Sequence, residues 1–189
     1  CGSSGMGGAA SLSSSAALKS GAGLVSACVP GQLRDNLPGQ VAEVMTVSPH
    51  NSSEYFSEEH ADFVVQLASE RNAVVLGCGL GVHPKTAAFV QHLIKHLQGP
   101  MLIDADGLNN LDDATLQERI GTAVITPHPR ELSRLCGQSV TEIQQNRIAT
   151  VRRLSQEWNV VLLLKGAYTL IGSPDGHIFI NVYEPLSSS

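Results

Sequence analysis

The chain has 189 residues, of which 42% are hydrophobic and only 4% aromatic, and its formal net charge is −5. This length allows one domain with a real core, and a core poor in aromatic residues favours an α/β protein over an aromatic-rich β-sandwich. The negative charge argues against a nucleic-acid partner or an anionic membrane surface, and no apolar run reaches the length of a membrane span.

Helices and strands are predicted to alternate along the chain. The first half predicts a helix over residues 9–20, strands over 24–29 and 42–47, a helix over 57–71, a strand opening into a glycine turn over 73–81, and a helix over 84–97. The second half predicts a strand over 101–108, a short helix over 116–120, a strand and helix start over 123–132, the longest amphipathic helix over 141–158, a strand over 160–166 and a hairpin over 169–181. We expect one domain over residues 1–183 and a short tail over 184–189.

The predicted strands are continuous apolar runs rather than alternating patterns, which is typical of a mostly parallel sheet covered on both faces. In such sheets ligands bind beyond the carboxyl ends of the strands. The glycine, aspartate, histidine and lysine motifs of this chain all follow predicted strand ends. Their shared placement predicts a single ligand site at that edge of the sheet.

Four cysteines, Cys1, Cys28, Cys78 and Cys136, form no Cys-x-x-Cys pair. They therefore indicate neither a zinc site nor a redox motif, and we expect free thiols, most of them buried, in a reducing compartment. Cys78 lies within a glycine turn, but no histidine or acidic residue is adjacent in the sequence to activate it.

Two glycine-rich segments precede predicted helices. In GSSGMGGAA (residues 2–10) the glycines would let the backbone approach a phosphate at a helix N-terminus, although a flexible terminus explains the composition equally well. No strand precedes this segment, so it is not a Rossmann fingerprint. The segment GCGLG (residues 77–81) follows a clear strand and is either a tight packing turn or a turn that a ligand approaches.

The segment IDADGLN (residues 103–109) places Asp104 and Asp106 two residues apart at a predicted strand end. Extended backbone would point both side chains the same way. Carboxylates in that position could bind a sugar hydroxyl or a metal, or could cap the following turn.

Two further motifs end neighbouring strands. TPHPRE (residues 126–131) holds His128 between two prolines, which fixes its direction, and puts Glu131 in the first turn of a helix, where a carboxylate suits the helix dipole. LKGAYT (residues 164–169) places Lys165 after a very apolar strand. That lysine either extends along apolar surface to water or reaches into the ligand cleft, and we favour the cleft.

Taken in order, these motifs resemble the ADP- or ATP-dependent NAD(P)H-hydrate dehydratase family, which has a ribokinase-like three-layer α/β fold. The match runs through GSSGMGGAA, VLGCGLG, LIDADGLN, ITPHPRELSRL and VVLLLKGAYTLI and covers roughly residues 2–181. A sugar or vitamin kinase of the same superfold would not be expected to carry this whole set.

The resemblance implies repair of the (6S) form of NADHX or NADPHX, by phosphoryl transfer to the hydroxyl and loss of phosphate, with ATP or ADP and Mg²⁺. It implies no protein metal ligand. The residues implied to contact or line the site of the hydrated nicotinamide nucleotide are Ala9, Gly79, Gly81, Asp104, Asp106, Asn109 and His128. Those implied to border the adenine nucleotide are Lys165, Gly166, Ala167, Tyr168 and Thr169.

The sequence departs from the family pattern at Ala42 and Cys78, where proline is usual, and at Arg130, where glycine is common. A fourth departure concerns the family's Gly-x-Gly-Asp turn, which binds phosphates and supplies the catalytic aspartate. After Asn181 this chain reads VYEPLSSS instead. The family's first strand would precede Cys1. The resemblance therefore predicts a domain shortened at both ends, with one face of its sheet exposed and no assigned catalytic residue.

Three functions remain open at this point. The chain is a dehydratase or a large part of one, a non-catalytic module that binds nucleotide or NAD(P)HX, or another ribokinase-like kinase for a small molecule such as a vitamin precursor. We expect a cytoplasmic protein, or a mitochondrial one after removal of a transit peptide, which could form homo-oligomers.

Overall fold

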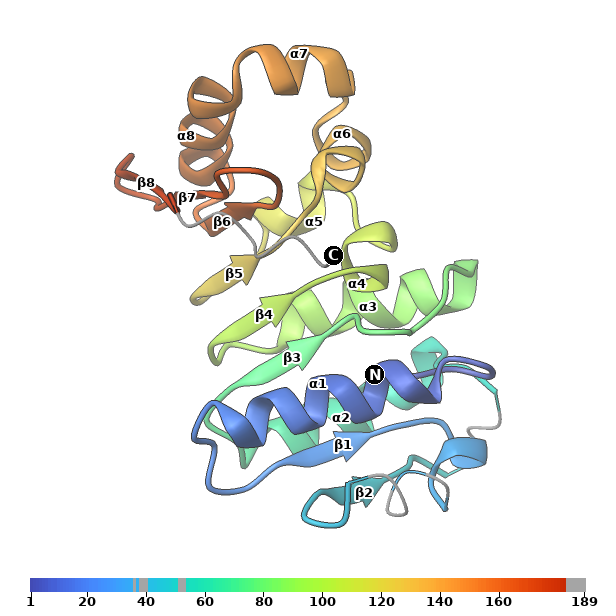
Figure 1. The fold of residues 1–189 in the computed structure, drawn as a ribbon. Helices are drawn as coiled ribbons and strands as arrows, with labels where there is room; N and C mark the ends of the chain where they lie inside the picture. Colours follow the sequence, from blue (N-terminus) through green and yellow to red (C-terminus); the bar gives the residue numbers. More distant parts are fainter. Residues whose placement is uncertain (36, 38–40, 51–53, 183–189) are drawn as a thin grey trace.

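The computed structural model describes residues 1–35, 37, 41–50 and 54–182 (Figure 1). Its helices are α1 (Gly7–Lys19), α2 (Ala61–Ser69), α3 (Pro84–His96), α4 (Asp106–Asn109), α5 (Asp113–Gln117), α6 (Pro129–Cys136), α7 (Val140–Gln145) and α8 (Arg147–Glu157), with the 3-10 turns η1 (Gly31–Leu33) and η2 (Glu58–His60). Its strands are β1 (Ser26–Cys28), β2 (Met45–Val47), β3 (Val74–Leu76), β4 (Met101–Ile103), β5 (Ala123–Ile125), β6 (Val161–Leu164), β7 (Leu170–Gly172) and β8 (Ile178–Ile180).

The strands form two sheets. The larger sheet has the order β3-β4-β5-β6-β7-β8, in which β3 to β6 are parallel and β7 and β8 form an antiparallel hairpin at the edge. The smaller sheet pairs β1 with β2 in parallel. The predicted mostly parallel α/β architecture is therefore confirmed, and all four carboxyl ends of β3 to β6 lie along one edge.

Helix starts follow local capping chemistry. Pro84 opens α3 at a position where its missing N–H costs nothing, and the His83 side chain accepts from the Lys85 backbone N–H. Ser139 and Glu142 close a capping box at the start of α7. These signals explain why the predicted helix starts at residues 84 and 141 lie close to the observed starts of α3 and α7.

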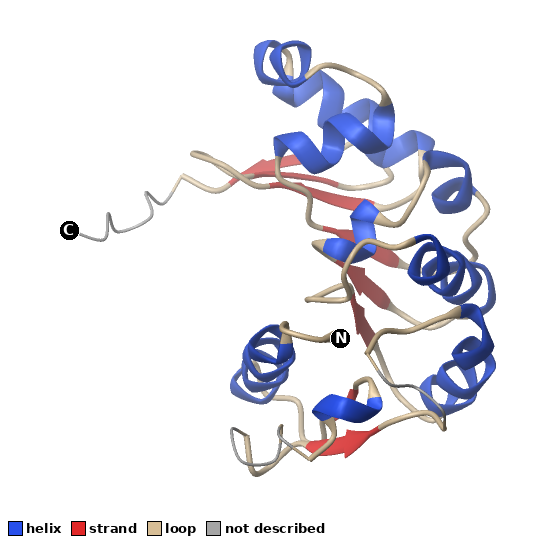
Figure 2. Ribbon diagram, turned by 90° about the vertical axis from the view of Figure 1, so that its right-hand side faces the viewer, coloured by secondary structure: helices blue, strands red, loops and turns tan. Residues whose placement is uncertain are grey.

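Figure 2 shows that most helices gather on one side of the six-stranded sheet, whereas α1 lies on the other side. Accordingly, the strand residues facing the helices are buried, among them Leu76, Ile103 and Ile125. The alternate residues form what we call the open face, made of Val75, Leu102, Val124, Leu163, Ile171 and Phe179. Two of its members are 49% (Val75) and 61% (Phe179) exposed. The cover predicted for both faces is thus not found along the six-stranded sheet, where the described helices cover one face, because α1 packs against β1 of the smaller sheet.

The helix predicted over residues 141–158 is wrong in one respect, because the structure contains α7 and α8 instead. Asn146 separates them with φ −129° and ψ 38°, outside the helical region. The helical spacing of apolar residues continues across this break, from Ile143 to Val151, and both are fully buried. The sequence pattern therefore gives no sign that the helix is interrupted at one residue. Neither piece is the longest helix among the described residues, since α1 and α3 have 13 residues each.

Two smaller predictions also need correction. The short helix predicted at 116–120 lies earlier, over α5, because the Asp112 side chain caps it by accepting from the Thr115 N–H. The four cysteines are free thiols as predicted. Most of them were expected to be buried, but all four are only half-buried. In the described part of the chain no helix is long and apolar enough to cross a membrane.

Candidate functional site

Backbone hydrogen bonds continue the ladder beyond the carboxyl ends of the parallel strands. The Asp104 N–H donates to Leu76 O (3.0 Å), and the Thr126 N–H donates to Ile103 O (3.2 Å). The Lys165 N–H donates to Pro127 O (3.0 Å). The segments that follow β3, β4, β5 and β6 therefore lie side by side, and the predicted convergence of their motifs is confirmed.

The centre of this row is an ion pair. Lys165 Nζ lies 2.5 Å from Asp104 Oδ1, with 41% of the lysine side chain and 26% of the aspartate side chain exposed. Burial of Asp104 raises its pKa, but hydrogen bonds from Lys165 and Thr126 and the lysine charge outweigh burial, so this pKa lies below its usual range. Lys165 therefore reaches over the strand ends to Asp104, and the carboxylate is held ionised.

The glycine turn after β3 packs against the turn after β4 and against α1. A Cβ on Gly77 would lie 1.8 Å from Asp104 O, and Gly77 has φ +129°. A Cβ on Gly79 would lie 2.8 Å from the Ala9 Cβ. Tight packing therefore explains why residue 77 is glycine. Gly79 and Ala9, which were both predicted to contact the substrate, lie next to each other.

Asp106 ties this glycine turn to α4. Its Oδ2 accepts from the Gly81 N–H (2.9 Å) and its Oδ1 accepts from Asn109 Nδ2 (3.2 Å). Asn110 donates from Nδ2 to Gly81 O (2.8 Å). Asp106 and Asn110, one helical turn apart, therefore bind the backbone N–H and the backbone C=O of Gly81.

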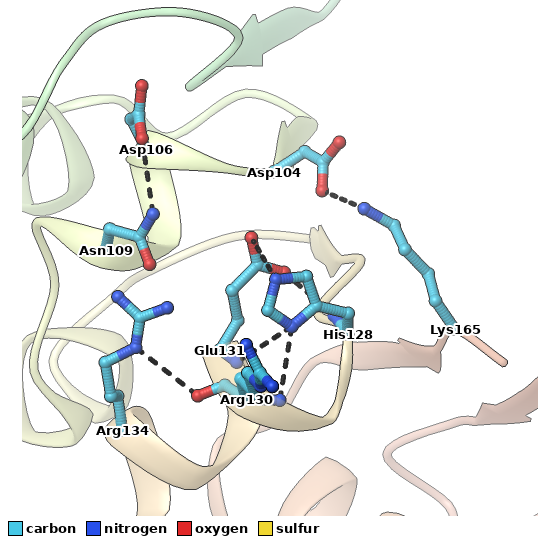
Figure 3. A network of polar contacts seen from close by, with 8 residues as sticks. All are labelled: Asp104, Asp106, Asn109, His128, Arg130, Glu131, Arg134 and Lys165. Carbon is cyan, nitrogen blue, oxygen red and sulfur yellow. Dashed lines mark hydrogen bonds and ion pairs between the residues drawn. The ribbon is translucent and has the colours of Figure 1, made fainter.

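The prediction that Asp104 and Asp106 point the same way because both lie in a strand is wrong. The strand ends at Ile103, Ala105 adopts φ 50° and ψ −121°, and Asp106 is the first residue of α4. Figure 3 shows the consequence: Asp104 meets Lys165, whereas Asp106 meets Asn109. The two carboxylates serve different halves of the site.

His128 is the N-cap of α6. Its Nδ1 accepts from the N–H groups of Arg130 and Glu131 (both 3.1 Å), and Glu131 Oε2 accepts from the His128 N–H (2.8 Å). With Nδ1 accepting, the ring proton sits on Nε2. The His128 side chain is 45% exposed, whereas that of Glu131 is only 7% exposed. The turn therefore presents the imidazole to solvent in a fixed orientation, and α6 packs against α4 (Figure 3).

The loop after β6, residues 165–169, has unusual backbone geometry. We call it the nucleotide loop, after the role that the family resemblance implies for it. Gly166 has φ +144° and Tyr168 has φ 55°, a left-handed conformation that is uncommon for a residue with a side chain. The Thr169 hydroxyl donates to Gly166 O (3.1 Å). Residues 166–168 are exposed, so the loop presents backbone at the surface beside Lys165.

A depression of about 330 Å³ adjoins the other half of the site, between the start of α3 and α4. Its lining includes Val82, His83, Asn109 and Asn110. The Oδ1 atoms of Asn109 and Asn110 are buried and have no hydrogen-bond partner.

Among residues 1–35, 37, 41–50 and 54–182, no group of three or more histidine, cysteine, aspartate or glutamate side chains could hold a metal ion. Mg²⁺ commonly binds through substrate phosphates and one or two carboxylates. The donor set here fits that mode, in which Asp104 is the ionised carboxylate nearest the nucleotide loop.

Sequence reasoning missed three residues that shape the site. Thr126 supports the charge of Asp104, Asn110 holds Gly81, and Arg147 contacts the nucleotide loop. Asn110 could have been found from its position directly after IDADGLN. Arg147 could not, because it lies 18 residues before Lys165 and on a different element.

Comparison with known proteins agrees with this geometry. A family model described as NAD(P)H-hydrate dehydratase matches residues 1–186. A bifunctional NAD(P)H-hydrate repair enzyme from Moorella thermoacetica is 40% identical over 183 residues, which cover 95% of this chain and 34% of that enzyme. An ADP-dependent (S)-NAD(P)H-hydrate dehydratase from Neisseria meningitidis is 35% identical over 187 residues, covering 95% of this chain and 58% of that protein.

Solved structures are similar as well. The ADP/ATP-dependent NAD(P)H-hydrate dehydratase of Bacillus subtilis, co-crystallised with ATP/Mg²⁺ and soaked with CoA, superimposes with a TM-score of 0.76 at 25% identity, over 96% of this chain and 63% of that chain. A ribokinase-like superfamily protein from Enterococcus faecalis gives a TM-score of 0.71 at 22% identity. The chain spans less than two thirds of the length of each of these relatives. It belongs to the NAD(P)H-hydrate dehydratase family and has a ribokinase-like α/β fold.

Proposed function

We propose that this chain binds an adenine nucleotide and (6S)-NAD(P)HX and serves the nucleotide-dependent dehydration of the hydrate to NAD(P)H. The observation that carries the proposal is the ion pair between Asp104 and Lys165, which joins the IDADGLN and LKGAYT segments at the strand ends. This pair links a glycine-turn half, with Ala9, Gly79 and Gly81, to the nucleotide loop, of which Lys165 is the first residue. A site with two such halves suits two ligands whose reacting groups meet between them.

The chemistry of this proposal is phosphoryl transfer to the hydroxyl of the hydrate, followed by loss of phosphate that restores the reduced nicotinamide. Positioning and charge stabilisation dominate such transfers. Lys165 would offset phosphate charge, the nucleotide loop would hold the adenine nucleotide, and the N–H groups at the start of α1 would face phosphate oxygens of the hydrate. Mg²⁺, carried by the nucleotide with Asp104 nearby, would supply further charge neutralisation.

In the part of the site proposed to hold the hydrate, His128, Asp106 and Asn109 would have different roles. The His128 imidazole is 45% exposed, and its Nε2 lies 3.5 Å from Glu131 Oε1; its Nε2–H would donate to the hydrate. Asp106 would position Gly81 rather than contact a ligand, because both its oxygens already accept hydrogen bonds. Asn109, with its unpartnered buried Oδ1, would accept from an amide or hydroxyl of the hydrate.

A second candidate is binding without turnover. The carboxylates of Asp104, Asp106 and Glu131 are each engaged, with Lys165, Gly81 and the His128 backbone respectively. None of the three is therefore poised to remove a proton from the hydroxyl.

We also propose a cytoplasmic location, because a reducing compartment suits the free thiols. A homo-oligomer would cover part of the open face.

The experiment is a pair of measurements on the purified chain. Calorimetric titration with ADP, with ATP and with each hydrate tests binding, and recovery of reduced-nicotinamide absorbance with hydrate plus nucleotide tests turnover. We expect saturable binding of adenine nucleotide and hydrate, and no binding of hydroxymethylpyrimidine or simple sugars. Binding with turnover supports the dehydratase, and binding alone supports the second candidate. Failure to bind any adenine nucleotide overturns both.

A further inference from the structure

Arg147, the first residue of α8, extends from that helix to the nucleotide loop. Its Nη1 donates to Ala167 O (2.8 Å), and its Nη2 approaches Tyr168 O at 3.4 Å. The two oxygens belong to consecutive residues, so one guanidinium holds two adjacent peptide groups. A planar fork of donors can do this, whereas a single ammonium group cannot match both oxygens with the same geometry.

Gly166 gives the guanidinium room. A Cβ on Gly166 would lie 3.2 Å from Arg147 Nη2 and within 3.9 Å of two further guanidinium atoms. The guanidinium therefore lies directly beside the glycine backbone. Any side chain at this position would force the arginine to shift, and φ +144° itself favours glycine.

The contact also fixes where the loop directs its donors. In a planar trans peptide the N–H points opposite to the C=O. Because Ala167 O faces Arg147, the Tyr168 N–H points away from it, on the other side of the loop. Tyr168 is held at φ 55°, a conformation that is costly in an unsupported chain.

The Arg147 side chain is partly desolvated. Its Nε atom is buried and unpartnered, so the hydrogen bonds from Nη1 and Nη2 to the loop are made at some desolvation cost.

We propose that Arg147 is a positioning residue that preorganises the nucleotide loop for an adenine nucleotide. It touches neither reacting group; it acts through the backbone of residues 166–168. Preorganisation raises affinity by removing the entropy cost of ordering the loop on binding. The inference rests on the proposed function for its ligand, but the ordering of the loop can be measured without any ligand.

The test compares Arg147→Gln and Arg147→Lys with Arg152→Gln in the full chain. Arg152 is a matched control, because it lies on the same helix and its Nε donates to a backbone oxygen, Gly176 O (3.2 Å), in the hairpin rather than the loop. Amide hydrogen exchange reports on residues 166–169 and on residues 175–177, and titration reports the Kd of ADP and ATP.

We expect Arg147→Gln to speed exchange in the nucleotide loop about tenfold and to raise the nucleotide Kd about tenfold. Exchange in the hairpin and the Kd of the hydrate should stay at wild-type values. Arg147→Lys should recover little, because charge without the fork does not bridge two carbonyls. Arg152→Gln should loosen the hairpin alone.

Unchanged loop exchange in both Arg147 variants overturns the inference. Equal weakening of nucleotide binding by Arg147→Gln and Arg152→Gln also overturns it, since that result indicates a general loss of helix stability. If the wild-type chain binds no adenine nucleotide while Arg147→Gln still frees the loop, the proposed function fails and the ordering role of Arg147 stands.

Discussion

Lys165 Nζ lies 2.5 Å from Asp104 Oδ1, although 61 residues separate the two in the sequence. The pair spans β5, because β4 and β6 are its flanking strands in the sheet. It therefore connects the two halves of the candidate site with a charge-assisted hydrogen bond.

Replacing Lys165 by Gln should raise the Kd of ADP and ATP by roughly tenfold or more, because the phosphates lose a cation and Asp104 loses its partner. Asp104→Asn should weaken nucleotide binding less, since the lysine charge remains. Titration calorimetry measures both. Lys19→Gln, at an exposed lysine in the last turn of α1, is the control, and an equal loss there would contradict the prediction.

The stability of the fold should depend on Asp104 at acidic pH. The pKa of Asp104 is lowered in the folded protein, so its ionised form stabilises the fold above the unfolded pKa of about 3.9. That stabilisation is lost as the pH falls through the lower folded value. Urea unfolding of wild type and Asp104→Asn between about pH 6 and about pH 2 should show a stability difference that shrinks with acid. A constant difference would argue against an ionised, paired Asp104.

Gly77→Ala should destabilise the fold by at least about 3 kcal/mol. The new Cβ would overlap Asp104 O at 1.8 Å, and φ +129° is strained for alanine. Gly99→Ala is the matched control, because a Cβ there meets nothing within 4 Å, and we expect a change within about 0.5 kcal/mol. Denaturant unfolding measures both, and similar midpoints for the two variants would refute the packing role.

His128→Asn separates helix capping from ligand contact. Asparagine is a good N-cap, so the free energy of unfolding should change by less than about 1 kcal/mol. Binding of the hydrate should nevertheless weaken, because the imidazole Nε2–H donor is gone. His128→Ala should lose about 1 kcal/mol of stability as well. Unaltered hydrate affinity in His128→Asn would leave the histidine with a capping role only.

The open face should make the chain self-associate. Phe179 is 61% exposed on it, and Val75 is 49% exposed. Replacing Phe179 by Thr should raise the concentration at which association begins by roughly tenfold, since contiguous exposed apolar surface drives such contacts. Sedimentation over a concentration series measures this. Glu70→Ser, at an exposed helix end, is the control; a shift as large as that of Phe179→Thr would count against the open face as the cause.

Much of the site was predictable because its residues follow strand ends. Parallel strands put all their carboxyl ends on one edge, so Gly81, Asp104, His128 and Lys165 could be assigned to a common edge before any distance was known. The Arg147 contact, by contrast, depends on where α8 begins. Apolar spacing ran through Asn146 without a sign of the break.

The sequence by itself determined the family, the α/β class, the order of the elements and the glycine, aspartate, histidine and lysine segments at the strand ends, because these are written in local composition and periodicity. Only the tertiary structure decided which side chains meet. Asp104 turned to Lys165 and Asp106 to Gly81 because the backbone leaves extended geometry at Ala105, and a single positive φ redirects every side chain that follows. Likewise, the guanidinium of Arg147 reaches the nucleotide loop because Gly166 leaves space that only the packed α8 and β6 bring together.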